Sequence, residues 1–169
     1  IDHNSEKEVL EKFRDILRNQ FFNSEILKLD IDLYQKEISK INEEGKEVTQ
    51  NQISNMSNIH QSLNLAKNCE DLVYFVEDDY LHELDSIEEM IFTYERISTQ
   101  INKELVICPA DYPYLYSNLQ NTNIFLGNKY HWRRIEETLC TFLTSKDLVN
   151  KYWDDFTSAC KTEHYPFEK

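Results

Sequence analysis

The chain has 169 residues, of which 40% are apolar and 12% aromatic, so it can form one packed domain and is not a disordered tail. Thirty-one Asp and Glu residues against eighteen Lys and Arg give a net charge of -13, which repels phosphate backbones and anionic lipid, so we expect no nucleic-acid partner and no strong membrane signal. We predict a single domain over residues 1–169. Because the sequence opens at Ile1 within a motif, we expect it to be truncated before Ile1, and a second truncation after Lys169 stays open.

The four cysteines, Cys69, Cys108, Cys140 and Cys160, form no C-x-x-C pair, which argues against a zinc site or a redox motif. Cys108 and Cys140 lie in apolar, strand-like runs and are most simply reduced core residues. Reduced cysteines are typical of the cytoplasm, and we therefore expect a cytoplasmic protein.

The first elements follow from caps and hydrophobic periodicity. Ser5 and Glu8 form a capping box, and apolar residues at helical spacing over 9–17 predict a first helix. The apolar residues of 25–32 predict a strand, and a polar helix is expected over 34–44, before a glycine.

A second series of elements predicts the centre of the fold. Apolar spacing from Ile53 to Ala66 predicts a helix, and Leu72–Val76 is a continuous apolar run typical of a buried parallel strand. Asp85 or Ser86 is expected to cap the next helix, and Leu105–Cys108 is a short strand stopped by proline.

The last elements complete an alternation of strand and helix. One or two strands are expected within Tyr130–Phe142, and Ser145 opens a final helix. Alternating elements predict an α/β sandwich with a mostly parallel central sheet flanked by helices. Gly45 and Gly127 are the only glycines, which argues against a phosphate-binding P-loop and a dinucleotide-binding fingerprint.

An acidic triplet, Glu77-Asp78-Asp79, follows the most apolar strand. Ligands of open α/β sheets bind at the carboxyl ends of strands, and three adjacent carboxylates repel one another unless a cation lies between them. Carboxylate oxygens are ligands for Mg²⁺ or Mn²⁺, which also bridge to substrate phosphates. The alternative is an ordinary loop start or helix cap, although no helix is predicted before Asp85.

Three segments together resemble a known family. Val73–Tyr80 resembles the D-x-D segment of GT-A glycosyltransferases, in particular the inverting family two. Ile1–Ser5 is similar to the D-x-x-S turn of that family, and Asn51–Asn68 to its Asn-containing helix. The chain would lack the first strand and helix of the family. The resemblance implies a GT-A-like, nucleotide-diphospho-sugar transferase sandwich.

The resemblance also implies roles for single residues. Asp2 matches the residue that contacts the nucleoside base, and Asp78 matches a residue near the ribose or pyrophosphate. Asp79 matches the metal-binding aspartate, with Glu77 as a second carboxylate for Mn²⁺ or Mg²⁺. Asn58 is placed on the nucleotide side, with a solvent-facing helix position as the alternative.

Inverting transfer needs a carboxylate that deprotonates the acceptor hydroxyl. The resemblance favours Asp155 and Glu163, because the catalytic base of the family lies near the start of a late helix. Solvated surface is the alternative for each of them. All the candidates in the second half of the chain are Asp111, Glu136, Glu137, Asp154, Asp155 and Glu163.

One basic cluster, His131–Arg134, stands out in this acidic chain. His131 and Arg133 are candidates for contact with a diphosphate, because a guanidinium binds two phosphate oxygens at once. His131 is also a candidate metal ligand. Ion pairing of the arginines with Glu136 or Glu137 is the alternative.

The preferred function is transfer of a sugar from a nucleotide-sugar donor to a carbohydrate or other hydroxyl acceptor, with inversion. Two rivals stay open. One is another metal-dependent nucleotide enzyme, a nucleotidyltransferase or phosphohydrolase. The other is a non-catalytic α/β interaction domain in which the triplet has no role.

Overall fold

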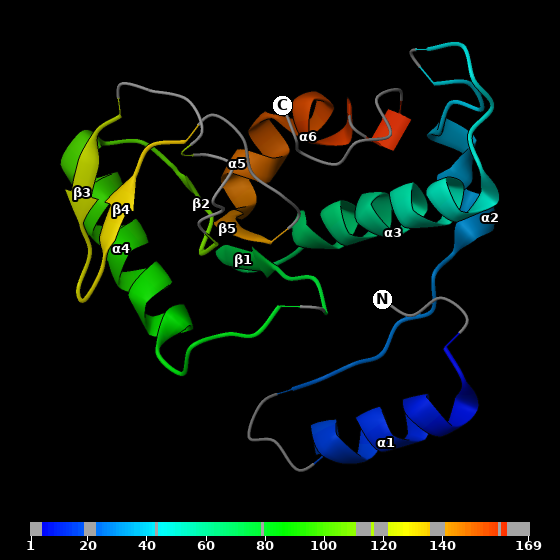
Figure 1. Ribbon diagram of the computed structural model, residues 1–169, viewed down its shortest axis with the longest axis horizontal. Helices are drawn as coiled ribbons and strands as arrows, with labels where there is room; N and C mark the ends of the chain where they lie inside the picture. The colour runs from blue at the N-terminus through cyan, green and yellow to red at the C-terminus, as the bar shows by residue number, and fades with distance from the viewer. Residues whose placement is uncertain are drawn as a thin grey trace.

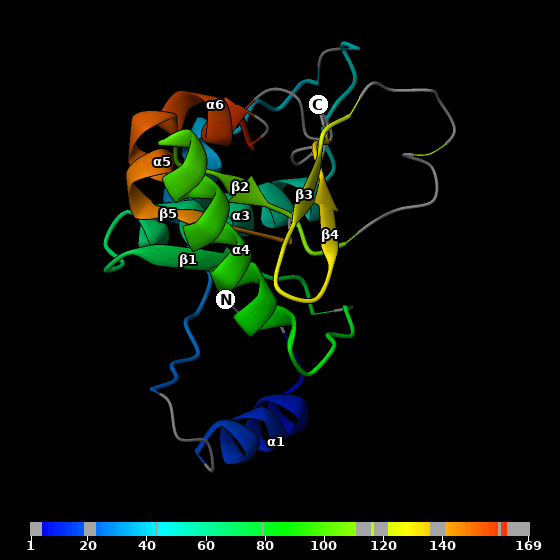
Figure 2. The same ribbon diagram turned by 90° about the vertical axis from the view of Figure 1, so that its left-hand side faces the viewer.

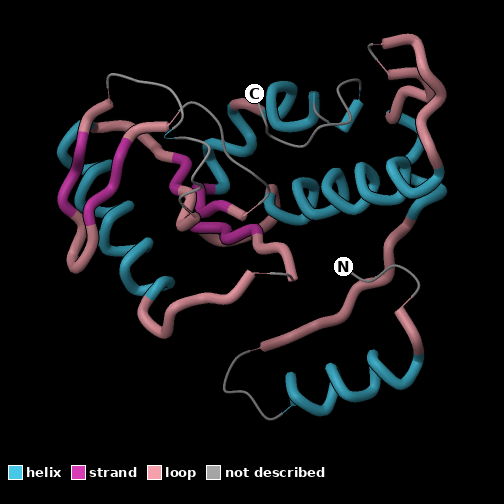
Figure 3. Tube along the Cα trace, viewed as in Figure 1, coloured by secondary structure: helices cyan, strands magenta, loops and turns pink. Residues whose placement is uncertain are grey.

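The computed structural model describes residues 5–18, 23–42, 44–78, 80–110, 116, 122–135, 141–158 and 160–161. Along the chain the helices and strands are α1 (Lys7–Arg18), α2 (Ile31–Tyr34), the 3-10 helix η1 (Gln35–Glu37), α3 (Gln50–Ala66), β1 (Leu72–Phe75), α4 (Ser86–Ile101), β2 (Val106–Ile107), β3 (Ile124–Leu126), β4 (His131–Arg133), β5 (Phe142–Ser145), α5 (Lys146–Lys151) and α6 (Trp153–Ser158). The strands β1, β2 and β5 lie between α4 on one side and α3, α5 and α6 on the other (Figure 3).

The central sheet has the strand order β1-β5-β2. Both outer strands run antiparallel to β5, with Phe75 opposite Phe142 and Ile107 opposite Leu143. The outer strands β1 and β2 therefore run in the same direction, and their carboxyl ends lie at the same edge of the sheet. A separate two-stranded sheet pairs β3 with β4, with Leu126 opposite His131.

The predicted GT-A-like sandwich with a mostly parallel central sheet is wrong. Every strand pairing within the described residues is antiparallel. The prediction assumed that each helix crosses over to a neighbouring parallel strand. Instead, the β3–β4 hairpin lies between β2 and β5 in the chain. Strand β5 then pairs between β1 and β2 and runs antiparallel to both. The apolar run of β1 reflects helices on both faces of an antiparallel sheet.

The two faces of the sheet carry different side chains, because side chains alternate along a strand. Val73 and Phe75 pack with Met56, Leu63 and the other residues of one core cluster, which α3, α5 and α6 cover. The even-numbered residues of β1 pack on the opposite face, which α4 covers. Figure 1 shows α4 with the β3–β4 hairpin on one side of the sheet and α3, α5 and α6 on the other.

Several predicted elements are confirmed. The helices expected around residues 9–17, 53–66 and after Asp85 are present as α1, α3 and α4. Thr49 and Gln52 form a capping box at the start of α3. Ser145 caps α5 as expected, accepting a hydrogen bond from the Leu148 amide. The short strand before Pro109 is β2.

The strand predicted over 25–32 is wrong. Its main chain pairs with a side chain of α3: the Asp30 amide donates to Gln61 Oε1 over 2.8 Å, and Gln61 Nε2 donates to the Lys28 carbonyl over 3.1 Å. Asp30 then caps α2 by accepting from the Leu33 amide over 3.0 Å. These polar contacts outweigh the β propensity of the apolar residues.

The polar helix predicted over 34–44 is also wrong. The chain leaves helical geometry after η1 and makes a turn closed by a bridge between Ile41 and Glu47. The Asn42 side chain accepts hydrogen bonds from two amides of this turn. Gly45 has a φ of 76°, which a side chain would disfavour, so the glycine marks a turn and not a helix end.

Helix α1 stands apart from the remainder in both ribbon views (Figures 1 and 2). None of its residues is buried, and the apolar residues Val9, Phe13 and Ile16 on its one face are about half exposed. Within the described part of the chain, no helix has the length and apolar character required to cross a membrane.

Candidate functional site

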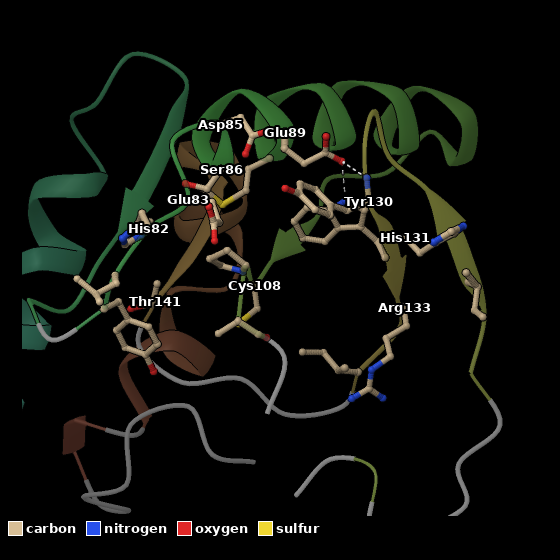
Figure 4. Close-up of a pocket in the computed structure, with 18 of the residues that line it drawn as sticks. His82, Glu83, Asp85, Ser86, Glu89, Cys108, Tyr130, His131, Arg133 and Thr141 are labelled. Atoms are coloured by element: carbon tan, nitrogen blue, oxygen red, sulfur yellow. Dashed lines mark hydrogen bonds between the residues drawn. The ribbon is translucent and has the colours of Figure 1, made fainter. Parts of the chain in front are cut away.

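A cavity of about 800 Å³ lies at the sheet edge where the carboxyl ends of β1 and β2 meet. The segment that follows β1, the start of α4, the end of β2 and the β3–β4 hairpin form its walls (Figure 4). Its lining residues are Tyr80, Leu81, His82, Glu83, Asp85, Ser86, Glu89, Met90, Cys108, Pro109, Ala110, Tyr116, Thr122, Ile124, Tyr130, His131, Trp132, Arg133, Ile135 and Thr141.

The acidic segment leaves β1 beside this cavity. The Glu77 amide donates a hydrogen bond of 3.1 Å to the hydroxyl of Thr141, which is a lining residue at the start of β5. Glu77 and Asp78 are exposed and do not line the cavity themselves. The structure therefore does not place the carboxylates of Glu77 and Asp78, predicted to hold a metal and to contact the ribose, in the wall of the cavity.

His82 lies on the wall formed by the segment after β1. Its Nε2 is hydrogen-bonded to the Tyr74 hydroxyl, and the two rings meet edge to face with centroids 5.7 Å apart. Burial, together with the nearby Cys108, raises the pKa of Tyr74, so the phenol stays protonated at neutral pH. Strand β1 thus fixes the orientation of His82 through the Tyr74 hydroxyl.

Two acidic side chains near His82 have different partners. Glu83 lines the cavity, and its carboxylate points into the hollow (Figure 4). Asp85 pairs with the Lys129 ammonium, with Oδ2 and Nζ 2.7 Å apart, and the hydrogen bond from Lys129 lowers the pKa of Asp85. The pair joins the start of α4 to the hairpin turn.

The β3–β4 hairpin brings two predicted phosphate-contacting residues to the cavity. His131 and Arg133 both line it, on the side away from His82 and Thr141 (Figure 4). The Arg133 guanidinium lies 4.3 Å from the centre of the Tyr116 ring. The structure places both basic residues at the cavity; their contact with a phosphate stays a prediction.

Glu89 joins α4 to the hairpin. It is 3% exposed, and its carboxylate accepts hydrogen bonds from the amides of Asn128, Lys129 and Tyr130 at 3.0, 2.9 and 3.4 Å. The Trp132 indole N–H donates to the same carboxylate at 3.1 Å. Burial alone would raise the pKa of Glu89, but these hydrogen bonds outweigh it and the pKa lies below its ordinary value.

The chemistry of the acidic segment fits a hard divalent cation. Glu77 and Asp78 supply exposed carboxylate oxygens, the ligand type that Mg²⁺ and Mn²⁺ prefer. Within the described residues no group of three His, Cys, Asp or Glu side chains is placed to hold a metal. An ion bound here would therefore take further oxygens from Asp79, from water or from substrate phosphates, as Mg²⁺ commonly does.

Other predicted site residues fall away from the cavity. Asn58 is half-buried on α3, where its carbonyl accepts from the Ser62 hydroxyl, and Asp155 is exposed on α6; neither lines the cavity. Asp2, Asp79 and Glu163 lie outside the described residues, and their roles stay predictions. The base candidates Asp111, Glu136 and Glu137 are likewise outside the described residues.

Sequence reasoning missed two residues of this site, His82 and Glu89. His82 lies close to the acidic triplet in the sequence, but nothing in the sequence predicts its contact with the Tyr74 hydroxyl. Glu89 has the spacing of an ordinary solvated helix residue. Its one signal is Gly127-Asn128, a dipeptide typical of a tight hairpin turn, between two short alternating runs.

No protein-family model, curated protein or solved structure matches this chain. The function is therefore argued from the cavity, since chemistry depends on the site and not on the fold that carries it.

Proposed function

We propose that this chain is a metal-dependent glycosyltransferase that moves a sugar, with inversion, from a nucleotide diphosphate to a hydroxyl acceptor. One observation carries the proposal. His82 and Glu83, on the segment that follows the acidic triplet, and the basic residues His131 and Arg133 line a single cavity from different sides.

The dimensions of the cavity support a ligand of nucleotide-sugar size. Its volume of about 800 Å³ is within the range of small-molecule sites. Its walls combine acidic, basic and aromatic side chains, among them Glu83, Arg133, Tyr130 and Trp132. A diphosphate needs positive charge, a nucleoside and a sugar need hydrogen bonds, and aromatic rings pack against both.

The residues of the chain have separate tasks in this proposal. Arg133 binds diphosphate oxygens with its guanidinium and so holds the leaving group. Carboxylates of the acidic segment would hold a Mn²⁺ or Mg²⁺ ion, which would supply Lewis acidity toward the diphosphate leaving group. The acceptor oxygen loses its proton to a carboxylate and attacks the anomeric carbon. Glu163 is a candidate for this base, and so are Asp111, Glu136 and Glu137. The electron pair of the broken carbon–oxygen bond leaves with the nucleoside diphosphate.

We further infer that the protein works in the cytoplasm. Cys69, Cys108 and Cys160 are free thiols in the described structure. Burial raises the pKa of Cys160 to about 12, which makes this thiol unreactive toward disulfide exchange. Reduced thiols of this kind are typical of the cytoplasm.

Metal-dependent binding of nucleoside diphosphates tests the proposal. Calorimetric titration with UDP, GDP and dTDP, each with and without Mn²⁺, is expected to give binding that needs the metal for at least one nucleotide. Asp79→Asn is expected to abolish the metal effect because it removes a charged ligand. Asp147→Asn, the same change at an exposed position in the first turn of α5, is the matched control and should bind as the wild type does.

Product analysis separates the rivals. A transferase releases the nucleoside diphosphate from a nucleotide-sugar, whereas a phosphohydrolase or nucleotidyltransferase splits the diphosphate and releases a nucleoside monophosphate or its ester. Binding that is indifferent to Mn²⁺ in the wild type would favour a non-catalytic interaction domain and would contradict the proposal.

A further inference from the structure

The β3–β4 hairpin forms a sheet of its own. Within the described chain its strands pair only with each other, over Ile124–Leu126 and His131–Arg133, and neither joins the β1-β5-β2 sheet. A two-stranded hairpin of this length is marginally stable in water by itself. Its orientation relative to the cavity must therefore come from side-chain contacts with the helix behind it.

Polar contacts with α4 supply that orientation. Glu89 accepts from three successive turn amides and from the Trp132 indole, and the buried Thr93 hydroxyl donates to it as well, at 3.3 Å. Arg96, one helical turn further along α4, donates to the Gly127 carbonyl over 3.3 Å. The turn is thus held to α4 at the residues that directly precede β4.

The turn is fitted to a carboxylate and to no larger group. An ionised Glu accepts only, so it satisfies five donors that a neutral amide could not all satisfy. A Cβ atom on Gly127 would lie 2.1 Å from Glu89 Oε1 and 2.6 Å from Trp132 Nε1, so the close approach depends on glycine. The carboxylate and the glycine together set the position of the hairpin against the helix.

We propose that Glu89 is a positioning residue of the active site, which holds the β3–β4 hairpin so that Arg133 reaches the diphosphate of the donor. Arg133 is three residues beyond the last amide that Glu89 binds, on a strand too short to keep its direction alone. The inference rests on the proposed function, because it assigns Glu89 an effect exerted through a phosphate-binding Arg133.

A double-mutant cycle tests the inference in the full chain. Affinity for UDP, GDP and dTDP in the presence of Mn²⁺ is measured for the wild type, Glu89→Gln, Arg133→Ala and the double variant. Each single change is expected to weaken binding by about tenfold or more, as expected for loss of a hydrogen bond to a charged group. The double variant is expected to bind more tightly than the sum of the two single losses predicts, because Glu89 acts through the hairpin that carries Arg133.

Two further variants make the result specific. Glu95→Gln is the same chemical change at an exposed position of α4, and it should bind as the wild type does. Trp132→Phe removes one donor to Glu89 and keeps a ring, so it should weaken binding by only about threefold, and by less than that in the Arg133→Ala background. This second variant tests the coupling even where Glu89→Gln unfolds the protein.

The possible failures are distinguishable. Wild-type affinity in folded Glu89→Gln, or losses that add in the double variant, would overturn the positioning role and leave the proposed function intact. Unchanged affinity in Arg133→Ala, or no metal-dependent binding by the wild type, would overturn the proposed function and the positioning role with it.

Discussion

Apolar residues pack against both faces of the central sheet, but the further contacts on the two faces differ. On the face covered by α3, α5 and α6, three aromatic rings stack in a row: Phe142 lies between Phe75 and Phe156, with ring centroids 4.8 and 6.0 Å away. On the face covered by α4, a buried carboxylate, Glu89, gathers hydrogen bonds from the hairpin that lines the cavity.

The difference separates stability from orientation. The free energy of apolar packing is roughly proportional to the buried area, and it changes little when the packed groups rotate slightly. A set of hydrogen bonds to one carboxylate instead fixes the orientation of the groups that donate them. The cavity lies on the side that uses directional contacts. Four substitutions probe this division, in order of decreasing expected effect.

Phe142→Ala is expected to have the largest effect on stability. The side chain is 1% exposed, and its removal leaves a cavity between two rings, which costs about 3–5 kcal/mol of unfolding free energy. Urea denaturation followed by tryptophan fluorescence measures the loss. Phe92→Ala, at a ring on α4 that is 39% exposed, is the control and should cost far less. Equal losses at the two positions would contradict the assignment of the stabilising core.

Gly127→Ala tests the directional face. The new Cβ would collide with the Glu89 carboxylate, so the hairpin must move, at a cost of about 1–3 kcal/mol. Nucleoside-diphosphate binding in the presence of Mn²⁺ should weaken as well. Gly45→Ala is the comparison: that residue meets no atom within 4 Å but has a positive φ, so about 1 kcal/mol of stability is lost without any change in binding. A Gly127→Ala variant with wild-type affinity would show that the hairpin position is unimportant.

His60 is a polar exception within the apolar half. The ring is 5% exposed, packs against Tyr34 and Trp153, and its Nδ1 has no hydrogen-bond partner. Burial lowers the pKa of His60, so below the ordinary value of 6.5 the unfolded chain takes up a proton that the folded chain resists. Stability is therefore lost as the pH falls from 6.5 through the lower folded pKa.

The His60→Leu variant lacks this loss. The unfolding midpoints of the variant and the wild type are compared at about pH 7 and about pH 5. The midpoint of the variant should rise relative to that of the wild type at the lower pH. A constant difference between the two proteins across this range would contradict the pKa direction.

Lys129→Met is expected to have the smallest effect. The ion pair with Asp85 is solvent-accessible, and exposed pairs contribute little. The unfolding midpoint should fall slightly at low ionic strength, and the difference from the wild type should vanish at about 1 M salt, where screening acts over a few ångströms. A difference that persists in high salt would point to packing of the lysine stem instead of charge.

Local signals in the sequence predicted several individual elements, although the strand over 25–32 and the helix over 34–44 were wrong. The periodicity of α3 and α4, the serine cap of α5 and the apolar run of β1 all depend on neighbours within one helical turn or one strand. The sheet could not be predicted in the same way. The insertion of β5 between β1 and β2 depends on which distant strands meet, and the alternation of helix and strand gave the wrong direction.

The candidate site was predictable in part. The basic cluster at His131–Arg133 was recognisable by residue type, and the structure places His131 and Arg133 at the cavity, whereas Glu77 and Asp78 of the acidic triplet do not line it. Glu89 was not recognisable, because a glutamate in a helix is ordinarily solvated, and its burial depends on a turn 39 residues away along the chain. The contact of Gln61 with residues 28 and 30 escaped prediction for the same reason.

The place of β5 in the sheet has a consequence for synthesis of the protein. Both β1 and β2 make their main-chain pairs in this sheet with a strand that emerges from the ribosome after them. Until residues 142–145 are translated, these two strands present unpaired edges, which are prone to join other chains. We therefore expect chains truncated before Phe142 to aggregate, and longer chains that include α5 to remain soluble.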